Sequence, residues 1–365
     1  MTGMATPQYS RRGFLAGVAL GAPALLRGQQ AASDIPRSFI QKEDVPGLSV
    51  AMARNGQVVF EQGFGWADRA SGEQVTPQHR FRIASVSKPI TSVALFTLIE
   101  EGRLKLHDFV FGSRGVLGTE FGKPPYHPHI EDIRIVDLMT HTCGGWTNDG
   151  HDPMFQHPQM NHADLIRWTL ANQPLVNAPG EKYAYSNFGY CLLGRVIEKL
   201  TKQPYTQYVH TAVLDRCGIT SMQVAGNTLA ERAAHEVVYY QAGDSPYGMN
   251  VRRMDSHGGW LATAADLVRF ALHVDGKSAA RSILKPESLR EMTTGSQANA
   301  GYAKGWAINK VPNWWHTGSL PGTATLLVRT ESGFCWAALA NTRSKDLAGA
   351  MDRMMLQLSE QFSKA

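Results

Sequence analysis

Apolar residues along this chain are spaced as in strands near both ends and as in helices in the middle. Residues 48–54 and 57–61 flank Asn55-Gly56, and this order is typical of a β-hairpin with a primed turn. Short apolar runs later in the chain predict further strands, and a longer periodic segment predicts a closing helix. These segments are 306–308, 325–328 and 335–339 for the strands and 346–362 for the helix.

Helical spacing dominates two segments in the middle of the chain. Residues 85–101 carry apolar residues three and four positions apart, and Pro89 is compatible with the first turn of a helix. Residues 188–200 predict a second helix. Residues 103–165 are rich in Gly, Pro and His, and they predict loops with short helices.

This order of elements predicts an α+β fold, in which an antiparallel sheet is flanked by helices and a mostly helical subdomain is inserted. We expect one domain over residues 33–365. Its sheet subdomain covers about 33–84 and 256–365, and its helical and loop subdomain covers about 85–255.

The first 32 residues resemble a twin-arginine export signal. Arg11-Arg12 precedes the apolar run 14–26, which is too short to span a bilayer comfortably. We therefore expect export to the periplasm or to the outside of the cell, with processing near Ser33. Gln29-Gln30 departs from the small-residue pattern of a cleavage site, so an uncleaved anchor is the alternative. A disordered basic tail would not explain the apolar run.

The charge of the chain mostly reflects this segment. The formal net charge is +5, and it falls to +2 without residues 1–32, because Arg11, Arg12 and Arg27 are not offset by any acid there. No run of Lys or Arg and no basic patch with interleaved aromatic residues indicates a nucleic-acid partner. No later apolar run is long enough for a membrane span.

The four cysteines lie far apart in the sequence. An exported protein could pair them fully in three ways. The helical and strand patterns around two of them favour buried free thiols, so we assign no disulfide. They are Cys143, Cys191, Cys217 and Cys335.

Ser85 and Lys88, at the start of the predicted helix, are the first candidates for chemistry. Residues three apart on a helix share one face, so a hydroxyl lies beside an amine. An amine in an apolar, partly desolvated pocket binds its proton less tightly, so it can take the proton of the hydroxyl and make it a nucleophile. The ordinary alternatives are a helix N-cap for Ser85 and a solvated surface lysine for Lys88.

Two later elements give this pair its context. Tyr185-Ser186-Asn187 begins 100 residues after Ser85, and His316-Thr317-Gly318-Ser319 begins 131 residues after Tyr185. In this order the chain resembles the serine β-lactamase and DD-peptidase superfamily. Its Y-x-N element resembles the class C-like branch, which includes family VIII carboxylesterases and D-aminopeptidases. Segments 45–50, 138–145 and 258–267 are similar to framework stretches of this family.

The resemblance implies a role for each residue of the first two elements. Ser85 is the nucleophile, and its backbone NH is one donor of the oxyanion hole. Lys88 is the base or proton shuttle. Tyr185 is a second base, and we expect cationic Lys88 to lower its pKa. Asn187 holds Lys88 and the acyl amide by hydrogen bonds, caps the following helix, or does both.

The third element departs from the pattern of the antibiotic-degrading members, which commonly carry Lys where this chain has His316. Thr317 and Gly318 continue the implied substrate-binding strand, and the NH of Ser319 is the second oxyanion donor. A neutral His offers less positive charge for a β-lactam carboxylate. We therefore expect esters or D-amino-acid peptides and amides as substrates. Arg343 is a candidate for binding a substrate carboxylate, or a solvated surface arginine.

Other classes of protein fit the sequence less well. Six histidines between His127 and His162 invite a zinc site, but they form no H-E-x-x-H pattern, and His235-Glu236 lacks the second His. The G-x-S-x-G motif of α/β-hydrolases is absent from the sequence. The presence of all the reactive residues together argues against a non-catalytic binding or scaffold protein on the same fold.

On these grounds we expect an exported serine hydrolase that needs no cofactor or metal. It forms and hydrolyses an acyl-enzyme on Ser85, and its substrate is a small-molecule ester, amide or D-peptide. A class C-like β-lactamase and a binding or scaffold protein are the alternatives.

Overall fold

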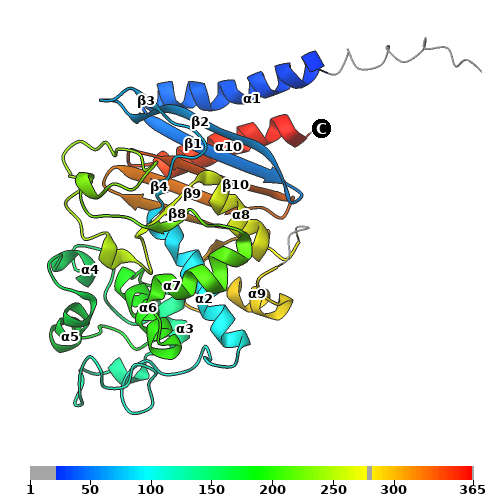
Figure 1. Cartoon of the computed structure of the whole chain (residues 1–365). Coiled ribbons are helices and arrows are strands. Elements are labelled where there is room, and N and C mark those ends of the chain that lie inside the picture. Colours follow the sequence, from blue (N-terminus) through cyan, green and yellow to red (C-terminus); the bar gives the residue numbers. More distant parts are fainter. Residues whose placement is uncertain (1–21, 278–281, 364–365) are drawn as a thin grey trace, which may run out of the picture.

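A seven-stranded antiparallel sheet lies at the centre of the fold, with strand order β3-β2-β1-β10-β9-β8-β7 (Figure 1). The structure, a computed structural model, describes residues 22–277 and 282–363. The first and last long strands are neighbours in the middle of the sheet, since Leu48 of β1 pairs with Ala340 of β10. The strands are β1 Gly47–Arg54, β2 Gln57–Asp68, β3 Glu73–Gln74, β7 Ala307–Ile308, β8 Trp314–Leu320, β9 Thr323–Arg329 and β10 Phe334–Ala340.

The predicted hairpin and late strands are confirmed. Asn55 and Gly56 join β1 to β2 with φ angles of 48° and 82°, as both central residues of a type I′ turn require. The predicted late strands correspond to β7, β9 and β10, and the predicted closing helix corresponds to α10 (Leu347–Ser363).

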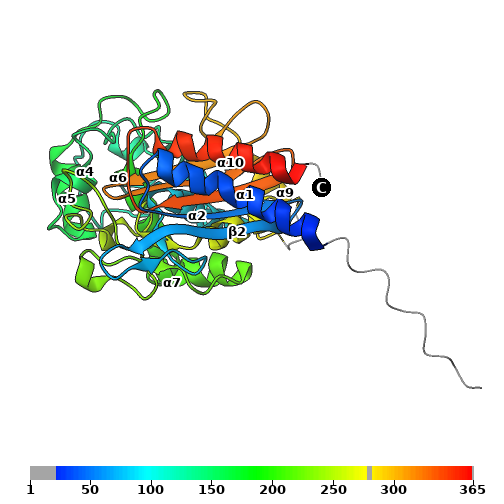
Figure 2. The same cartoon turned by 90° about the horizontal axis from the view of Figure 1, so that it is seen from above.

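Helices α1 (Ala22–Lys42) and α10 cover one face of the sheet and lie side by side (Figures 1 and 2). Phe39 of α1 and Met351 of α10 are buried in one apolar cluster with Val50 of β1. The expected signal boundary after Ala32 falls inside α1, and Ala32 itself is buried. The paired arginines of the signal lie outside the described residues, so the signal stays a prediction.

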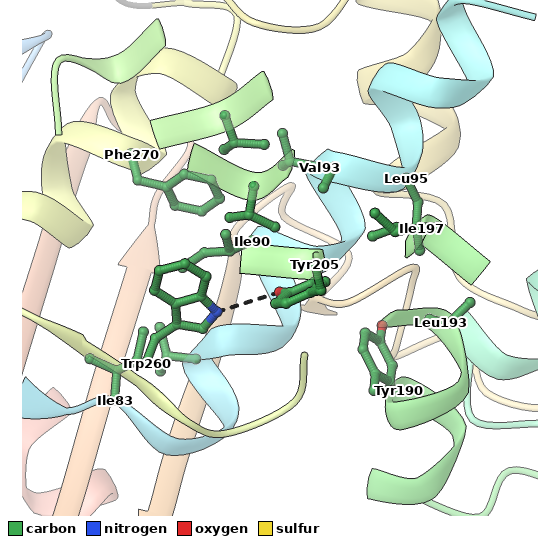
Figure 3. Packing of buried hydrophobic residues seen from close by; sticks show 14 of the residues in the cluster. Ile83, Ile90, Val93, Leu95, Tyr190, Leu193, Ile197, Tyr205, Trp260 and Phe270 are labelled. Carbon is green, nitrogen blue, oxygen red and sulfur yellow. Dashed lines mark hydrogen bonds between the residues drawn. The ribbon is translucent and has the colours of Figure 1, made fainter. Parts of the chain in front are cut away.

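The other face of the sheet packs on α8 (Ala264–Val274) and on the helical region. Helix α2 (Ser87–Glu100) runs through the middle of that region, and it is buried from Ser87 to Leu98, since its own apolar residues are distributed around all of its sides. Figure 3 shows Ile90 and Val93 of α2 in one apolar cluster with Trp260 and Phe270.

The rest of the helical region consists of further helices and a small second sheet. The helices are α3 Ile135–Met139, α4 Pro153–Gln156, α5 His162–Asn172, α6 Asn187–Thr201, α7 Tyr205–Val209 and α9 Pro286–Met292. The strands β4 (Phe81–Arg82), β5 (Gln223–Val224) and β6 (Trp260–Ala262) form the second sheet, in the order β4-β6-β5. The architecture is thus the expected α+β arrangement.

Two further sequence predictions can be compared with this structure. All four cysteines are buried and free, as expected. Helix α6 begins one residue earlier than predicted, and its N-cap is Ser186, whose Oγ accepts the Gly189 NH at 3.0 Å. The capping alternative for Asn187 is therefore wrong.

Within residues 22–277 and 282–363, no helix has the length and apolar character needed to cross a membrane.

Candidate active site

Ser85 lies on a tight turn between β4 and α2. Residues Ala84–Val86 form one turn of 3₁₀ helix that leads into α2, so the regular helix begins two residues later than predicted. Ala84 has a φ of 48°, an uncommon value for a residue with a Cβ. Ser85 is nevertheless three residues from Lys88 on a continuous helical path, and its side chain is only half-buried. The turn therefore presents the hydroxyl at the surface of an otherwise buried segment.

Lys88 is fully buried and donates hydrogen bonds to three oxygens. Its Nζ lies 3.1 Å from Ser85 Oγ, 2.8 Å from Asn187 Oδ1 and 3.0 Å from the His257 carbonyl. Burial holds the pKa of Lys88 well below its usual value, although the nearby Asp152 carboxyl acts in the opposite direction. Lys88 is therefore not a solvated surface lysine, and its neutral form can accept the Ser85 proton across the 3.1 Å contact.

Tyr185 joins this group, but with a different electrostatic character from the one expected. Its ring centroid lies 4.7 Å from Lys88 Nζ, and its side chain is hydrogen-bonded to Ser85. Burial raises the pKa of Tyr185 above its usual value, and the Ser85 hydrogen bond only partly opposes this. The prediction that Lys88 lowers the pKa of Tyr185 is therefore wrong. In the resting site Tyr185 is therefore a phenol, and the roles of Lys88 and Tyr185 in proton transfer stay predictions.

Asn187 connects Lys88 to a carboxyl group that sequence reasoning missed. The amide of Asn187 accepts from Lys88 through Oδ1, and its Nδ2 donates to Asp152 Oδ2 at 3.0 Å. The predicted hold of Asn187 on Lys88 is thus present. Asp152 is buried, and burial raises its pKa to about 6. Asp152 followed by Pro153 is a helix-start signature, and the Asp152 side chain accepts the Met154 NH at 3.0 Å. The Asp152-Pro153 pair is thus the sequence signal from which this carboxyl could have been found.

Strand β8 approaches the Ser85 turn closely at Gly318. A Cβ on Gly318 would lie 2.3 Å from the Ile83 carbonyl oxygen and 3.0 Å from Ala84 Cβ, so only glycine fits between strand and turn. Thr317 and Ser319 are exposed on either side of it. The exposed side chains of Thr317 and Ser319 are therefore available for the substrate-binding role that the resemblance implies. The oxyanion role of the Ser319 NH stays a prediction.

His316 is buried at the start of this element and is neutral. Its Nδ1 lies 2.7 Å from the Thr317 carbonyl, and its Nε2 lies 3.1 Å from the Tyr302 hydroxyl. Burial, assisted by the charge of Lys88, lowers the pKa of His316 to about 3. This agrees with the neutral imidazole expected from the sequence. Tyr302 and its second partner, His141, were not predicted as site residues. His141 falls in a segment assigned to framework, and nothing in the sequence around Tyr302 distinguishes it.

Arg343 lies apart from this group. Its Nη2 pairs with Asp244 Oδ2 at 3.0 Å, and it lines a surface hollow of about 650 Å³ with Tyr240 and Thr342. None of the residues around Ser85 lines that hollow. The role of Arg343 toward a substrate carboxylate stays a prediction.

The dense histidines of the sequence are dispersed in the structure. His151 contacts Asp149, His157 packs on the Trp168 ring, and His162 contacts Asp255. In the part of the chain that the structure describes, no three His, Cys, Asp or Glu side chains meet in a group that could hold a metal ion.

Residues 31–359 match the sequence profile of the Beta-lactamase family. The chain belongs to this family of serine hydrolases. Protein flp of Staphylococcus aureus (strain MRSA252) is 26% identical over 340 residues, which are 90% of this chain and 66% of that protein. Penicillin-binding protein 4* of Bacillus subtilis (strain 168) is 26% identical over 311 residues, which are 77% of this chain and 64% of that protein. This Beta-lactamase family chain thus spans slightly less than two thirds of the length of these relatives.

Solved structures of other proteins share its fold. The D-amino acid amidase from Ochrobactrum anthropi SV3, complexed with L-phenylalanine amide, superposes with a TM-score of 0.74 at 19% identity over 93% of this chain and 99% of the amidase. The octameric penicillin-binding protein homologue from Pyrococcus abyssi gives 0.70 at 22% identity, over 90% and 77% of the two chains. The β-lactamase/transpeptidase-like fold expected for this Beta-lactamase family member is confirmed.

Proposed function

We propose that this chain is an exported serine hydrolase that forms an acyl-enzyme on Ser85 and acts on esters or D-amino-acid amides and peptides, without a cofactor. The observation that carries the proposal is the contact between Ser85 Oγ and the buried Nζ of Lys88 at 3.1 Å. A buried amine with a lowered pKa beside a half-exposed hydroxyl is the arrangement that makes serine nucleophilic at neutral pH.

The reaction follows from these contacts. Neutral Lys88 takes the Ser85 proton as Oγ attacks the substrate carbonyl, and the new ammonium is held by Asn187 Oδ1 and the His257 carbonyl. The NH groups of Ser85 and Ser319 stabilise the oxyanion. Tyr185 passes its phenolic proton to the leaving group, and the Lys88 ammonium, which lies 4.7 Å from the Tyr185 ring centroid, returns a proton to the phenolate and becomes neutral again. A water then repeats these proton transfers to release the acid.

The substrate class rests on His316. A buried imidazole with a pKa of about 3 brings no positive charge to β8 at neutral pH, so it offers no ionic partner to a β-lactam carboxylate. The relative with the higher of the two TM-scores is an amidase, which supports amides as substrates. A class C-like β-lactamase is the second candidate, because the rest of the site fits it equally well.

A substrate panel with matched variants tests this proposal. The purified protein and Ser85→Ala are assayed with p-nitrophenyl esters, D-amino-acid amides, D-alanyl peptides and a chromogenic cephalosporin. We expect turnover of an ester or a D-amide that is lost in Ser85→Ala, and slow inhibition by penicillin. Cephalosporin turnover above that of every ester, amide and D-peptide would favour the β-lactamase. Turnover of none, together with no labelling by a fluorophosphonate, would favour a binding protein. His316→Lys should raise β-lactam turnover.

Export is supported by the paired arginines and the apolar run that follows them. The expected result is that the full chain reaches the periplasmic fraction of a bacterial host and that Arg11→Lys with Arg12→Lys retains it in the cytoplasm. Equal distribution of the two proteins would contradict export by this route.

A further inference from the structure

A chain of four hydrogen bonds runs from the turn before α6 to strand β8. The Ser186 NH donates to His141 Nδ1 at 3.1 Å. His141 Nε2 and His316 Nε2 each lie 3.1 Å from the Tyr302 hydroxyl. His316 Nδ1 lies 2.7 Å from the Thr317 carbonyl. Two segments far apart in the sequence, which carry the second and third reactive elements, are therefore joined through side chains.

The two backbone ends determine where the protons of this chain lie. The Ser186 NH can only donate, so Nδ1 of His141 accepts and its Nε2 carries the proton that Tyr302 receives. The Thr317 carbonyl can only accept, so Nδ1 of His316 carries a proton. If His316 is neutral, its Nε2 then accepts the Tyr302 proton. With both imidazoles neutral, every donor of the chain faces one acceptor.

The surroundings favour this single arrangement. His141, Tyr302 and His316 are all buried, so a broken link costs the desolvation of an unpaired polar group. The Tyr190 hydroxyl also contacts Tyr302, and because its own proton goes to the Met139 carbonyl at 2.9 Å, it can only accept there and competes with His316 Nε2 for the Tyr302 proton. Donation to Tyr190 would leave the buried Nε2 of a neutral His316 without a donor, so donation to His316 is the arrangement that pairs it.

The chain also touches the reactive phenol. The ring of His141 packs on the ring of Tyr185 with centroids 4.1 Å apart, and the ring of His316 lies 6.4 Å from it. The titratable groups that face His316 are Lys88 of α2, Tyr185, Tyr302 and His141. Among them, Lys88 is the group that becomes a cation when it takes the Ser85 proton, and its charge then disfavours a proton on His316.

We propose that His141 and Tyr302 are positioning residues that hold His316 as a neutral imidazole protonated on Nδ1, and that keep the Tyr185 turn and strand β8 aligned. This inference rests on the proposed acyl-enzyme function and deepens it. It explains how β8 carries a histidine near Ser85 and Lys88 without bringing a positive charge of its own.

The tautomers of the unmodified protein test the proposal without any substrate. Long-range ¹H–¹⁵N correlation spectra of protein labelled with ¹⁵N-histidine distinguish the two forms, and His141→Gln and His316→Gln identify the two signals. We expect His141 to carry its proton on Nε2 and His316 to carry its proton on Nδ1, with both neutral down to pH 5. The opposite tautomer at either position, or a protonated His316 at pH 6, would overturn the proposal.

The variant Tyr302→Phe tests whether the Tyr302 hydroxyl keeps His316 neutral. It removes one hydroxyl and leaves the ring, so Nε2 of His316 loses the donor that stabilises the neutral form. We expect the His316 titration to rise by about one pH unit or more, which corresponds to one lost hydrogen bond. We expect kcat to fall about tenfold with KM changed by less than about threefold, because alignment acts on the transition state. The acid limb of the kcat profile should move with the His316 titration.

Tyr183→Phe is the matched control. Its ring lies 5.7 Å from the Tyr302 ring. Among the described residues, the Tyr183 hydroxyl takes no part in the four hydrogen bonds that link Ser186 to Thr317. The Tyr183→Phe variant should leave the His316 titration unchanged. If Tyr302→Phe lowers thermal stability but shifts neither the titration nor kcat, its role is structural only and the proposal fails. The tautomer result is separate from the proposed function, which instead fails if Ser85 is not acylated.

Discussion

Gly318→Ala should separate strand β8 from the nucleophile turn. The added Cβ would lie 2.2 Å from Thr325 Oγ1 and 2.3 Å from the Ile83 carbonyl oxygen, and these two oxygens are themselves hydrogen-bonded at 2.8 Å. The second contact is to backbone, so it cannot be relieved by a side-chain rotation. Strand and turn must therefore move apart by about 1 Å to restore ordinary contact distances.

The size of the effect follows from that displacement. A shift of about 1 Å in a reacting group costs about 100-fold in rate, so we expect kcat for acylation to fall about 100-fold. Overpacking of this kind costs about 1–3 kcal/mol, so the free energy of unfolding should fall by that amount while the protein still folds. Stopped-flow release of p-nitrophenolate from a p-nitrophenyl ester measures the first quantity, and urea unfolding measures the second.

Gly248→Ala is the control, since its nearest neighbours belong to Ser245 at 3.7 Å. It should keep the wild-type acylation rate. A second change, Thr325→Ala in the Gly318→Ala protein, removes the side-chain contact but not the Ile83 carbonyl, so we expect at most a partial recovery. Wild-type acylation in Gly318→Ala would refute the reasoning, because it would show that the spacing between β8 and the turn does not control the reaction.

Three further predictions concern the residues around Ser85. Peptide mapping after a fluorophosphonate should place the adduct on Ser85, and labelling that survives in Ser85→Ala would contradict this. Lys88→Ala, Tyr185→Phe and the double variant should lose similar amounts of kcat, because groups that act as one unit are not additive; wild-type turnover in Tyr185→Phe would remove Tyr185 from the mechanism. Asp152 binds its proton more tightly in the folded protein, where its pKa is about 6, than in the unfolded chain, so wild-type stability should fall as the pH rises from about 4 to about 6 and stay low above that. Urea unfolding at pH 4, 5 and 7 should show a smaller fall in Asp152→Asn, and an equal fall would mean that another group is responsible.

The sequence predicted those parts of the fold that depend on local chemistry. The Asn55-Gly56 turn needs two positive φ angles, and helix α6 needs a cap and an apolar face, so both can be recognised from a few neighbouring residues. Strands β4 and β5 have two residues each and exist because β6 pairs with both, so no pattern in the sequence indicates them.

The chemistry of the site likewise divides into contacts that the sequence predicts and properties that depend on the assembled fold. The contact of Lys88 with Ser85 follows from helical spacing, and the contact with Asn187 follows from the family resemblance. The protonation state of Tyr185 does not, because burial decides its pKa and burial is a property of the assembled fold. Asp152 was not predicted for a related reason. Capping of helix α4 already explains an Asp before Pro153, so the sequence does not indicate that the same side chain also accepts from Asn187.

The central place of β10 in the sheet has a consequence for biosynthesis. Until residues 334–340 have been made, β1 and β9 each have one unpaired side, and the two halves of the sheet have no hydrogen bonds to each other. A nascent chain therefore cannot close its sheet before residues 334–340 have left the ribosome, and β1 must wait for its second partner, whose paired residues lie 280 to 292 positions further along the chain. During that interval the exposed strand edges can pair with other chains and aggregate. We therefore expect a chaperone that binds the nascent chain until β10 has been made to increase the yield of folded protein.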